Sequence, residues 1–287
     1  MKQLMLIMIW LLALCGSAAA QSSVWLVKQG DSRTYLGGTC HVLRQSDYPL
    51  PAEFERAYQA VERVVFEADP GQLNSPRMLQ LLATRAFLAD GVTLQQLLQP
   101  ATYRLLQDHC RRNGLQPEAF SRLRPAMAAL TLLTMELQRQ GIDQGGVDLH
   151  FYQRATDDGK AVAALETIDQ QIEFMVAMAE GREDRFLMYS LAELERLDEI
   201  FNSLIAAWRS GDGAEIARLA NADFKRQFPE IYRTLFTERN AAWLPLIEGY
   251  LATAEPELVL VGVAHLVGED GLVAELRRRG YQVELLD

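Results

Sequence analysis

The chain has 287 residues, of which 49% are apolar, 23% charged and 8% aromatic, and this composition is typical of a folded globular protein rather than a disordered chain, a collagen or a small disulfide-stapled domain. With 28 Lys and Arg against 38 Asp and Glu, the formal charge is −10. This acidity argues against nucleic acid as a partner, because binding a phosphate backbone needs basic surface. Only 4 His and 3 Cys are present, so metal or nucleophile chemistry depends on very few side chains.

The first 20 residues have the pattern of a secretory signal peptide. One cation, Lys2, precedes eleven uninterrupted apolar residues, Leu4 to Leu14, which are too few to span a bilayer. Small residues follow, and Ala18 to Ala20 fit the A-x-A rule for cleavage. We therefore expect an exported protein, periplasmic or secreted, with no transmembrane segment in the mature chain. A lipoprotein anchored through Cys15 is the less favoured alternative, because a leucine precedes it where a small residue is needed.

Removal of these residues leaves 27 basic and 38 acidic side chains, a net charge of −11, and two cysteines, Cys40 and Cys110. In an oxidising compartment an even number of cysteines is able to pair. Two free buried thiols are an equally good interpretation, because the sequence does not give the Cα separation on which a disulfide depends.

A predicted β-hairpin opens the mature chain, with strands at Val24 to Val27 and Arg33 to Gly37 around a turn-like Gln-Gly-Asp-Ser segment. Residues 53–63 then have apolar side chains at helical spacing. Residues 64–66 form a short apolar strand that ends at Glu67. This first part of the chain is therefore a strand, helix, strand unit.

Residues from about 71 to 255 are overwhelmingly helical in pattern, with glycines and prolines marking the breaks. Long helices such as Arg185 to Arg209 carry apolar residues at intervals of three and four, which predicts packing faces rather than sites. One strand is expected inside this segment, at Lys160 to Leu165, and it ends at Glu166.

The C-terminal part repeats the arrangement of the first part. Leu258 to Val261 is a continuous apolar strand, residues 270–279 form a helix that Gly280 ends, and Tyr281 to Leu286 is a final strand. The arginines at 277–279 suit the C-terminus of that helix, so we do not assign them to a phosphate site.

Both ends of the chain therefore have the order strand, Gly-x-x-His, helix, strand, acid, which we interpret as a weak internal duplication. Right-handed crossovers make the strands of each half parallel. The expected fold class is α/β, with two βαβ halves forming a mixed, largely parallel sheet and the large helical segment carried between them. We expect one domain over residues 21–287.

Two of the four histidines, His41 and His265, stand three residues after a glycine that closes an apolar strand, Gly38 or Gly262. Ligands bind at the carboxyl ends of the strands in a parallel α/β sheet. Glycine allows the backbone to turn sharply at such a point. The pattern therefore predicts that both imidazoles reach one edge of the sheet.

The carboxylates Glu67 and Glu166 close two further strands at this edge. Two imidazoles and one carboxylate suit a catalytic divalent cation with an open water position, and a further carboxylate suits a general base. The spacing is not that of a helix-borne HExxH zinc protease. The alternative is that both histidines are structural, with hydrogen bonds to backbone at the strand ends.

Six segments, in order and over nearly the whole mature chain, carry a resemblance to a known family. They read YLGGTCHVL, RVVFEAD, GVDLHFYQRATDDGKAVAALET, WRSGD, TERNAAWLPLIEGYL and VLVGVAHLVGEDGLVAELRRRGYQVELL. With its paired Gly-x-x-His motifs, the chain resembles the TraB/GumN family, which includes the TIKI metalloproteases and is related to proteins with the erythromycin-esterase and ChaN-like fold.

The resemblance implies a metal-dependent hydrolase, in particular a peptidase acting on a peptide or a small ester or amide. Carried over by position, His41, His265 and Glu67 hold the divalent ion, which is Mn, Zn or Co, while Gly38 and Gly262 shape the turns. Metal-bound water ionises near neutrality and supplies the nucleophile.

Four further residues fall on positions that the family marks: Asp148, Glu166, Arg239 and Asn240. Arg239 suits a substrate carboxylate or an oxyanion, and it suits a structural salt bridge equally well. Asp148 is either catalytic or the N-terminal cap of the helix that begins there.

Two alternatives belong to other classes. In the first, Cys40 is a thiolate activated by His265, although adjacent residues in an extended chain, such as Cys40 and His41, point to opposite sides. In the second, the protein is a non-catalytic envelope component that binds a ligand in the same cleft, for example as an accessory to surface polysaccharide assembly.

Overall fold

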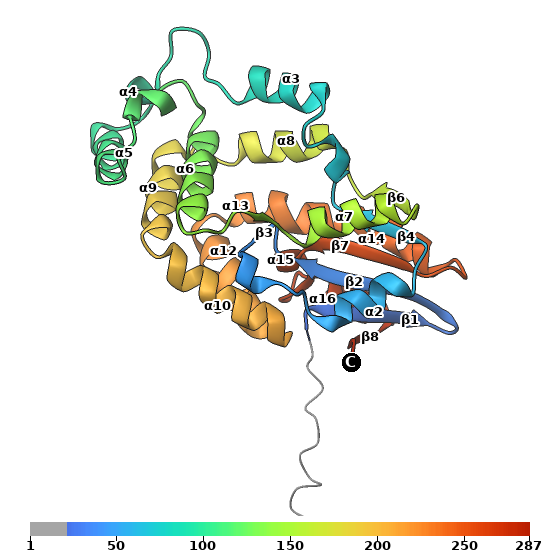
Figure 1. Ribbon diagram of the computed structural model, residues 1–287. Helices are drawn as coiled ribbons and strands as arrows, with labels where there is room; N and C mark the ends of the chain where they lie inside the picture. The colour runs from blue at the N-terminus through green and yellow to red at the C-terminus, as the bar shows by residue number, and fades with distance from the viewer. Residues whose placement is uncertain (1–21) are drawn as a thin grey trace, which may run out of the picture.

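The computed structural model describes residues 22–287. The predicted signal peptide and Cys15 lie outside the described residues. Within them, one six-stranded sheet is covered by helices, and a group of helices extends away from the sheet (Figure 1). No helix in residues 22–287 is long and apolar enough to cross a bilayer.

The sheet of the described chain has the strand order β6-β4-β7-β2-β1-β8. Every neighbouring pair from β6 to β2 is parallel, and β1 is antiparallel to both β2 and β8. A small second sheet pairs β3 with β5. The strands are β1 (Val24–Gln29), β2 (Ser32–Thr39), β3 (Val42–Leu43), β4 (Arg63–Phe66), β5 (Gln144–Gly145), β6 (Ala161–Ala164), β7 (Glu257–Gly262) and β8 (Gln282–Leu285).

This sheet confirms the predicted α/β class and its mostly parallel character. The two strands of each βαβ half run in the same direction but are not neighbours. β7 lies between β2 and β4, and both β2 and β1 lie between β7 and β8. The two halves are therefore interleaved, and β2 pairs directly with β7, with Thr39 opposite Gly262. Since each of these strands leads into a Gly-x-x-His motif, the interleaving brings the two motifs side by side.

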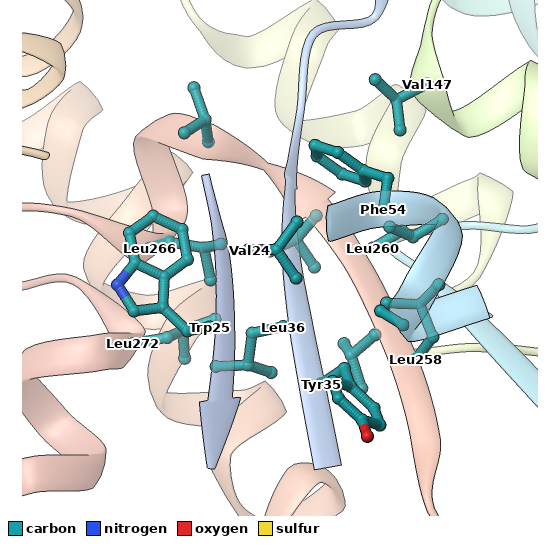
Figure 2. Packing of buried hydrophobic residues seen from close by; sticks show 14 of the residues in the cluster. Val24, Trp25, Tyr35, Leu36, Phe54, Val147, Leu258, Leu260, Leu266 and Leu272 are labelled. Carbon is teal, nitrogen blue, oxygen red and sulfur yellow. The ribbon is translucent and has the colours of Figure 1, made fainter. Parts of the chain in front are cut away.

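Helices pack on both faces of the sheet. A Cβ on Gly37 would meet Leu260 of β7 and Phe54 of α2 (Ala52–Gln59), whereas a Cβ on Gly38 would meet Val263 and Leu266 of α15 (Val263–Leu266). Because successive residues of a strand face opposite sides, α2 and α15 cover opposite faces. The buried side chains on both faces form the main hydrophobic cluster, part of which is drawn in Figure 2.

The helical elements of the described residues are mostly short. The α-helices are α2 (Ala52–Gln59), α3 (Pro76–Arg85), α4 (Leu94–Leu97), α5 (Pro100–Arg112), α6 (Pro125–Arg139), α7 (Val147–Asp157), α8 (Ile168–Ala177), α9 (Glu183–Leu194), α10 (Leu197–Ser210), α11 (Gly213–Ile216), α12 (Asp223–Gln227), α13 (Pro229–Tyr232), α14 (Arg239–Leu251), α15 (Val263–Leu266) and α16 (Leu272–Arg278). The 3-10 helices are η1 (Gln45–Asp47), η2 (Pro70–Gln72) and η3 (Pro117–Phe120), and η4 (Ala217–Ala222) and η5 (Arg233–Glu238) are π-helical.

The helical segment has hydrophobic clusters of its own, separate from the main cluster. The single helix expected at residues 185–209 is broken at Glu195 and Arg196 into α9 and α10. Leu191 of α9 is buried in the second cluster, while Trp208 of α10 is buried in the main cluster. Because of this break, the apolar face of α9 packs in the second cluster while the apolar face of α10 packs in the main cluster.

Candidate functional site

The two Gly-x-x-His motifs meet at the carboxyl ends of β2 and β7. An ideal Cβ on Gly262 would lie 3.1 Å from Glu67 Oε1 and 3.4 Å from His41 Nε2, and one on Gly38 would lie 2.7 Å from a methyl carbon of Val263. Neither glycine has a positive φ. Glycine therefore suits both positions because a side chain would collide with neighbouring atoms. A left-handed backbone conformation is not the reason.

His41 is held by Asp148 from the first turn of α7. Asp148 Oδ2 lies 2.9 Å from His41 Nδ1, and its Oδ1 accepts a 3.0 Å hydrogen bond from Thr39 Oγ1. The N-cap of α7 is Gly146, with no side-chain cap, so Asp148 is not the helix cap that was one of its two expected roles. Gly146 and Val147 donate backbone hydrogen bonds to the carbonyls of His41 and its neighbour, which fixes the start of α7 beside the histidine.

This pairing sets the charge and orientation of His41. Asp148 accepts from Nδ1–H and leaves Nε2 without a hydrogen-bond partner among the described residues. The negative charge of Asp148 raises the pKa of His41 to about 9. The imidazole is 63% exposed, and it lines a cavity of about 430 Å³ together with Glu67 and Arg239. His41 therefore presents an unoccupied nitrogen to a space that can receive a ligand.

A buried ion network lies directly behind this cavity. Arg239, the first residue of α14, donates to Glu166 from Nε at 3.0 Å and from Nη2 at 2.8 Å, and to Glu67 Oε2 from Nη2 at 2.7 Å. Its Nη1 lies 3.0 Å from His265 Nε2 and donates to the carbonyl of Leu235 at 3.2 Å. All five N–H groups of the guanidinium are thus engaged by the protein.

This saturation decides between the two roles expected for Arg239. A guanidinium has five donors in a fixed fork, and here none is left for a substrate carboxylate or an oxyanion. The guanidinium carbon also lies 4.6 Å from the ring centroid of Trp243, one helical turn further along α14. Arg239 therefore acts in this geometry as a positioning residue that holds Glu67, Glu166 and His265 in place.

The two carboxylates of the network differ in their environments. Burial alone would raise the pKa of Glu67, but the positive groups around it and a 2.6 Å hydrogen bond from the Gly262 amide lower it to about 2. Burial raises the pKa of Glu166 despite its two hydrogen bonds from Arg239. Glu67 is therefore the firmly ionised member, and Glu166 is the more easily protonated one.

His265 is a neutral imidazole of known tautomer in this arrangement. Asn240 Nδ2 donates to the carbonyls of His265 and Asp270, so its Oδ1 is the atom that faces His265 Nδ1 at 2.8 Å. Nδ1 therefore carries the proton, and Nε2 accepts from Arg239. Burial lowers the pKa of His265 to about 3. Rings of Trp243 and Phe236 lie 4.6 and 4.8 Å from the imidazole centroid and complete its apolar surroundings.

The structure brings together every residue that the sequence assigns to the site, but the predicted metal ligands are not free. Both histidines have the second-shell pattern of metal ligands, with Nδ1 held by an oxygen acceptor. However, Arg239 engages His265 Nε2 and Glu67 Oε2, and no group of three or more His, Cys, Asp or Glu donors in residues 22–287 is arranged to hold a metal ion. The described geometry therefore does not fit the three-ligand centre that the sequence predicts.

The cysteines do not form the disulfide that was one expectation. Cys40 and Cys110 are both free and buried, the first in the main cluster and the second in the cluster of the helical segment. Burial raises the pKa of the Cys40 thiol strongly. A thiol nucleophile needs a lowered pKa and access to substrate, so this environment does not favour Cys40 as the nucleophile.

Sequence reasoning did not assign Thr39 or Trp243 to the site. Thr39 is the second residue of the first Gly-x-x-His motif, but the sequence does not show which side chain its hydroxyl contacts. Trp243 follows Arg239 by four residues, the spacing at which side chains share one face of a helix, and that spacing was the available signal.

The fold and site together define an α/β protein with a mostly parallel sheet and two histidine motifs that meet a buried Glu-Arg-Glu network at adjacent strand ends. The model of the TraB/PrgY/gumN family matches residues 23–285, and the chain belongs to this family. It is also similar to the uncharacterized protein YbaP of Shigella flexneri, with 23% identity over 268 residues, 92% of this chain and 96% of that protein. No solved structure matches the chain significantly.

Proposed function

We propose that this protein is an exported hydrolase of peptide, amide or ester bonds in which His41 activates the attacking water. The observation that carries the proposal is the His41–Asp148 pair, whose unpartnered Nε2 lines a cavity of about 430 Å³. A histidine held in one orientation by a carboxylate is the usual general base for acyl transfer.

The reaction follows from the protonation states of this pair. Deprotonated His41 accepts a proton from water at Nε2 while the water oxygen bonds to the substrate carbonyl carbon. The Asp148 carboxylate stabilises the imidazolium that forms. His41 then returns this proton to the leaving amine or alkoxide as its bond to the carbonyl carbon breaks. The buried network keeps Glu67 ionised beside this point and holds His265 in place after β7.

The divalent ion expected from the sequence is a separate prediction. No step above passes through it, because two of its three expected ligands are engaged by Arg239. A metal-bound form would require the guanidinium to leave His265 Nε2, and metal analysis of the purified protein tests this directly.

The test of the proposed function compares His41 with a histidine that lines a different cavity. Mature wild type, His41→Gln and His150→Gln are assayed on chromogenic peptides, amides and esters. His150 is partly buried on α7, in a different cavity, so its variant is the matched control. We expect hydrolysis by wild type and the control and its loss in His41→Gln. Equal turnover in all three proteins, or none by wild type on any of the three classes, would overturn the proposal.

A further inference from the structure

The cavity beside His41 is apolar over most of its wall. Its apolar residues come from the segment after β4, from α3, α7 and α8, and from η5. The largest of them are Leu73, Met78, Leu149, Ile168, Phe174, Met175 and Leu235. Leu73 stands out because it is 44% exposed. Exposed apolar surface in a cavity next to reactive groups is typical of a ligand site rather than of a solvated face.

The floor of the cavity lies between α3 and α8 and is closed by packing. Ile168 is buried in a small cluster with Leu81 and Val176, and Met78 and Met175 pack against the same cluster. The cavity therefore has no channel between α3 and α8 into which a long acyl chain would continue, and we refer to it as the bowl. Its volume of about 430 Å³ is within the range of about 300 to 1,000 Å³ for small-ligand pockets. Methionine side chains adapt to occupants of different shape.

The charged groups that line the bowl add a second constraint on its occupant. They are His41 and Arg239 on the positive side and Glu67, Asp69 and Asp148 on the negative side. Arg239 has no free donor, and His41 is paired with Asp148. An acidic group in the bowl would therefore meet three carboxylates, and its one available cationic partner would be His41 through Nε2, the atom that the proposed function assigns to the attacking water.

We propose that this bowl is the specificity subsite of the enzyme and binds an uncharged apolar side chain, of the size of Leu, Met or Phe, adjacent to the scissile bond of a peptide. The inference rests on the proposed hydrolase function and adds its substrate class. The occupant is a side chain rather than a fatty acyl chain because the bowl is closed at its floor, and an acidic side chain is excluded by the three carboxylates.

The kinetic test varies one residue of a peptide. Two series of quenched fluorescent peptides carry Leu, Ala or Glu on the acyl side or on the amine side of the scissile bond. In one of the series, kcat/KM should fall about tenfold or more from Leu to Ala and further to Glu. The gain from acetyl to octanoyl esters of one alcohol should be no larger than the gain from Ala to Leu in that series, because the bowl takes up only the first carbons of the chain. A preference for octanoyl over acetyl without any preference for Leu would overturn the assignment, as would equal rates across both peptide series.

Two variants on one segment locate the subsite. Leu73 lines the bowl and is 44% exposed, whereas Leu79 of α3 is 58% exposed and does not line it. Leu73→Asp should lower kcat/KM for the Leu peptide about fivefold, the factor for losing the burial of half an apolar side chain. Leu79→Asp should leave it unchanged. Equal effects of the two variants would place the side chain elsewhere.

A binding measurement separates failure of the subsite from failure of the hydrolase. Ligand-observed NMR compares N-acetyl-leucinamide with N-acetyl-glycinamide on wild type, Leu73→Asp and Leu79→Asp. Preferential binding of the leucine compound that is lost only in Leu73→Asp supports the subsite even if no substrate is hydrolysed. Hydrolysis of peptides without any such preference would retain the proposed function and overturn the subsite.

Discussion

Replacement of Arg239 tests the central claim about the buried network. The side chains of Arg239, Glu67 and Glu166 are 9%, 7% and 5% exposed, so Arg239→Met would leave two buried carboxylates close together and without the guanidinium that they share. Breaking a buried ion pair by removing one partner costs about 3 to 5 kcal/mol. We expect a loss of this size in the free energy of unfolding, measured by urea denaturation at pH 7.5. Arg239→Lys should recover only part of it, since an ammonium has three donors and cannot reproduce the fork.

The pH dependence of this loss gives the sharper test. In wild type the pKa of Glu67 is lowered, so its contribution to stability is present above the unfolded-state pKa of about 4.3 and is lost as the pH falls toward 2. In Arg239→Met both carboxyl groups should have raised pKa values, and protonation at low pH relieves their burial. The difference between the two proteins should therefore shrink from pH 7.5 to pH 5. Adding Glu166→Gln should restore part of the stability at pH 7.5. A loss below about 1 kcal/mol, or one that does not change with pH, would refute this account.

Three further predictions concern the catalytic side of the site. If His41 is the base, kcat/KM rises with pH up to about 9 because Asp148 raises the pKa of the imidazole. In Asp148→Asn the midpoint of this rise should move toward the ordinary histidine pKa of about 6.5. The same midpoint in both proteins would contradict the pairing of His41 with Asp148. Gly262→Ala should reduce activity and thermal stability because its Cβ would lie only 3.1 Å from Glu67 Oε1. Gly249→Ala, whose Cβ would meet nothing within 4 Å inside a helix, should instead stabilise the protein by up to about 1 kcal/mol. Plasma mass spectrometry should find no stoichiometric Mn, Zn or Co in wild type; stoichiometric metal that is lost in both His41→Ala and His265→Ala would instead support the centre predicted from the sequence.

The elements that build the sheet were predictable because each follows from a local pattern. The hairpin, the strand before Glu67 and the strand before Gly262 are all present where apolar runs end at turn residues. The order of the strands was not predictable in this way, because nothing local to residues 257–262 says that β7 lies between β2 and β4. Register and neighbour choice are set by packing across the whole sheet.

The site shows the same division. The two Gly-x-x-His motifs and strand-end acids identified which residues gather at one edge. Their protonation states and partners depend on side-chain contacts that spacing does not encode. Arg239 shows this most clearly, because its residue type suits an oxyanion, a substrate carboxylate or a salt bridge. The contacts with Glu67, Glu166 and His265 give it the last of these roles.

The central position of β7 has a consequence for how the chain acquires its fold. This strand comes from the last 31 residues, yet it is the parallel neighbour of β2 on one side and of β4 on the other. Until β7 has been synthesised, β2 and β4 each have one unpaired edge. Each of them then pairs with a strand that lies about 200 residues further along the chain. Such long-range pairing slows folding. A chain built this way completes its parallel sheet, and with it the edge that carries both Gly-x-x-His motifs, only after its last strands have arrived.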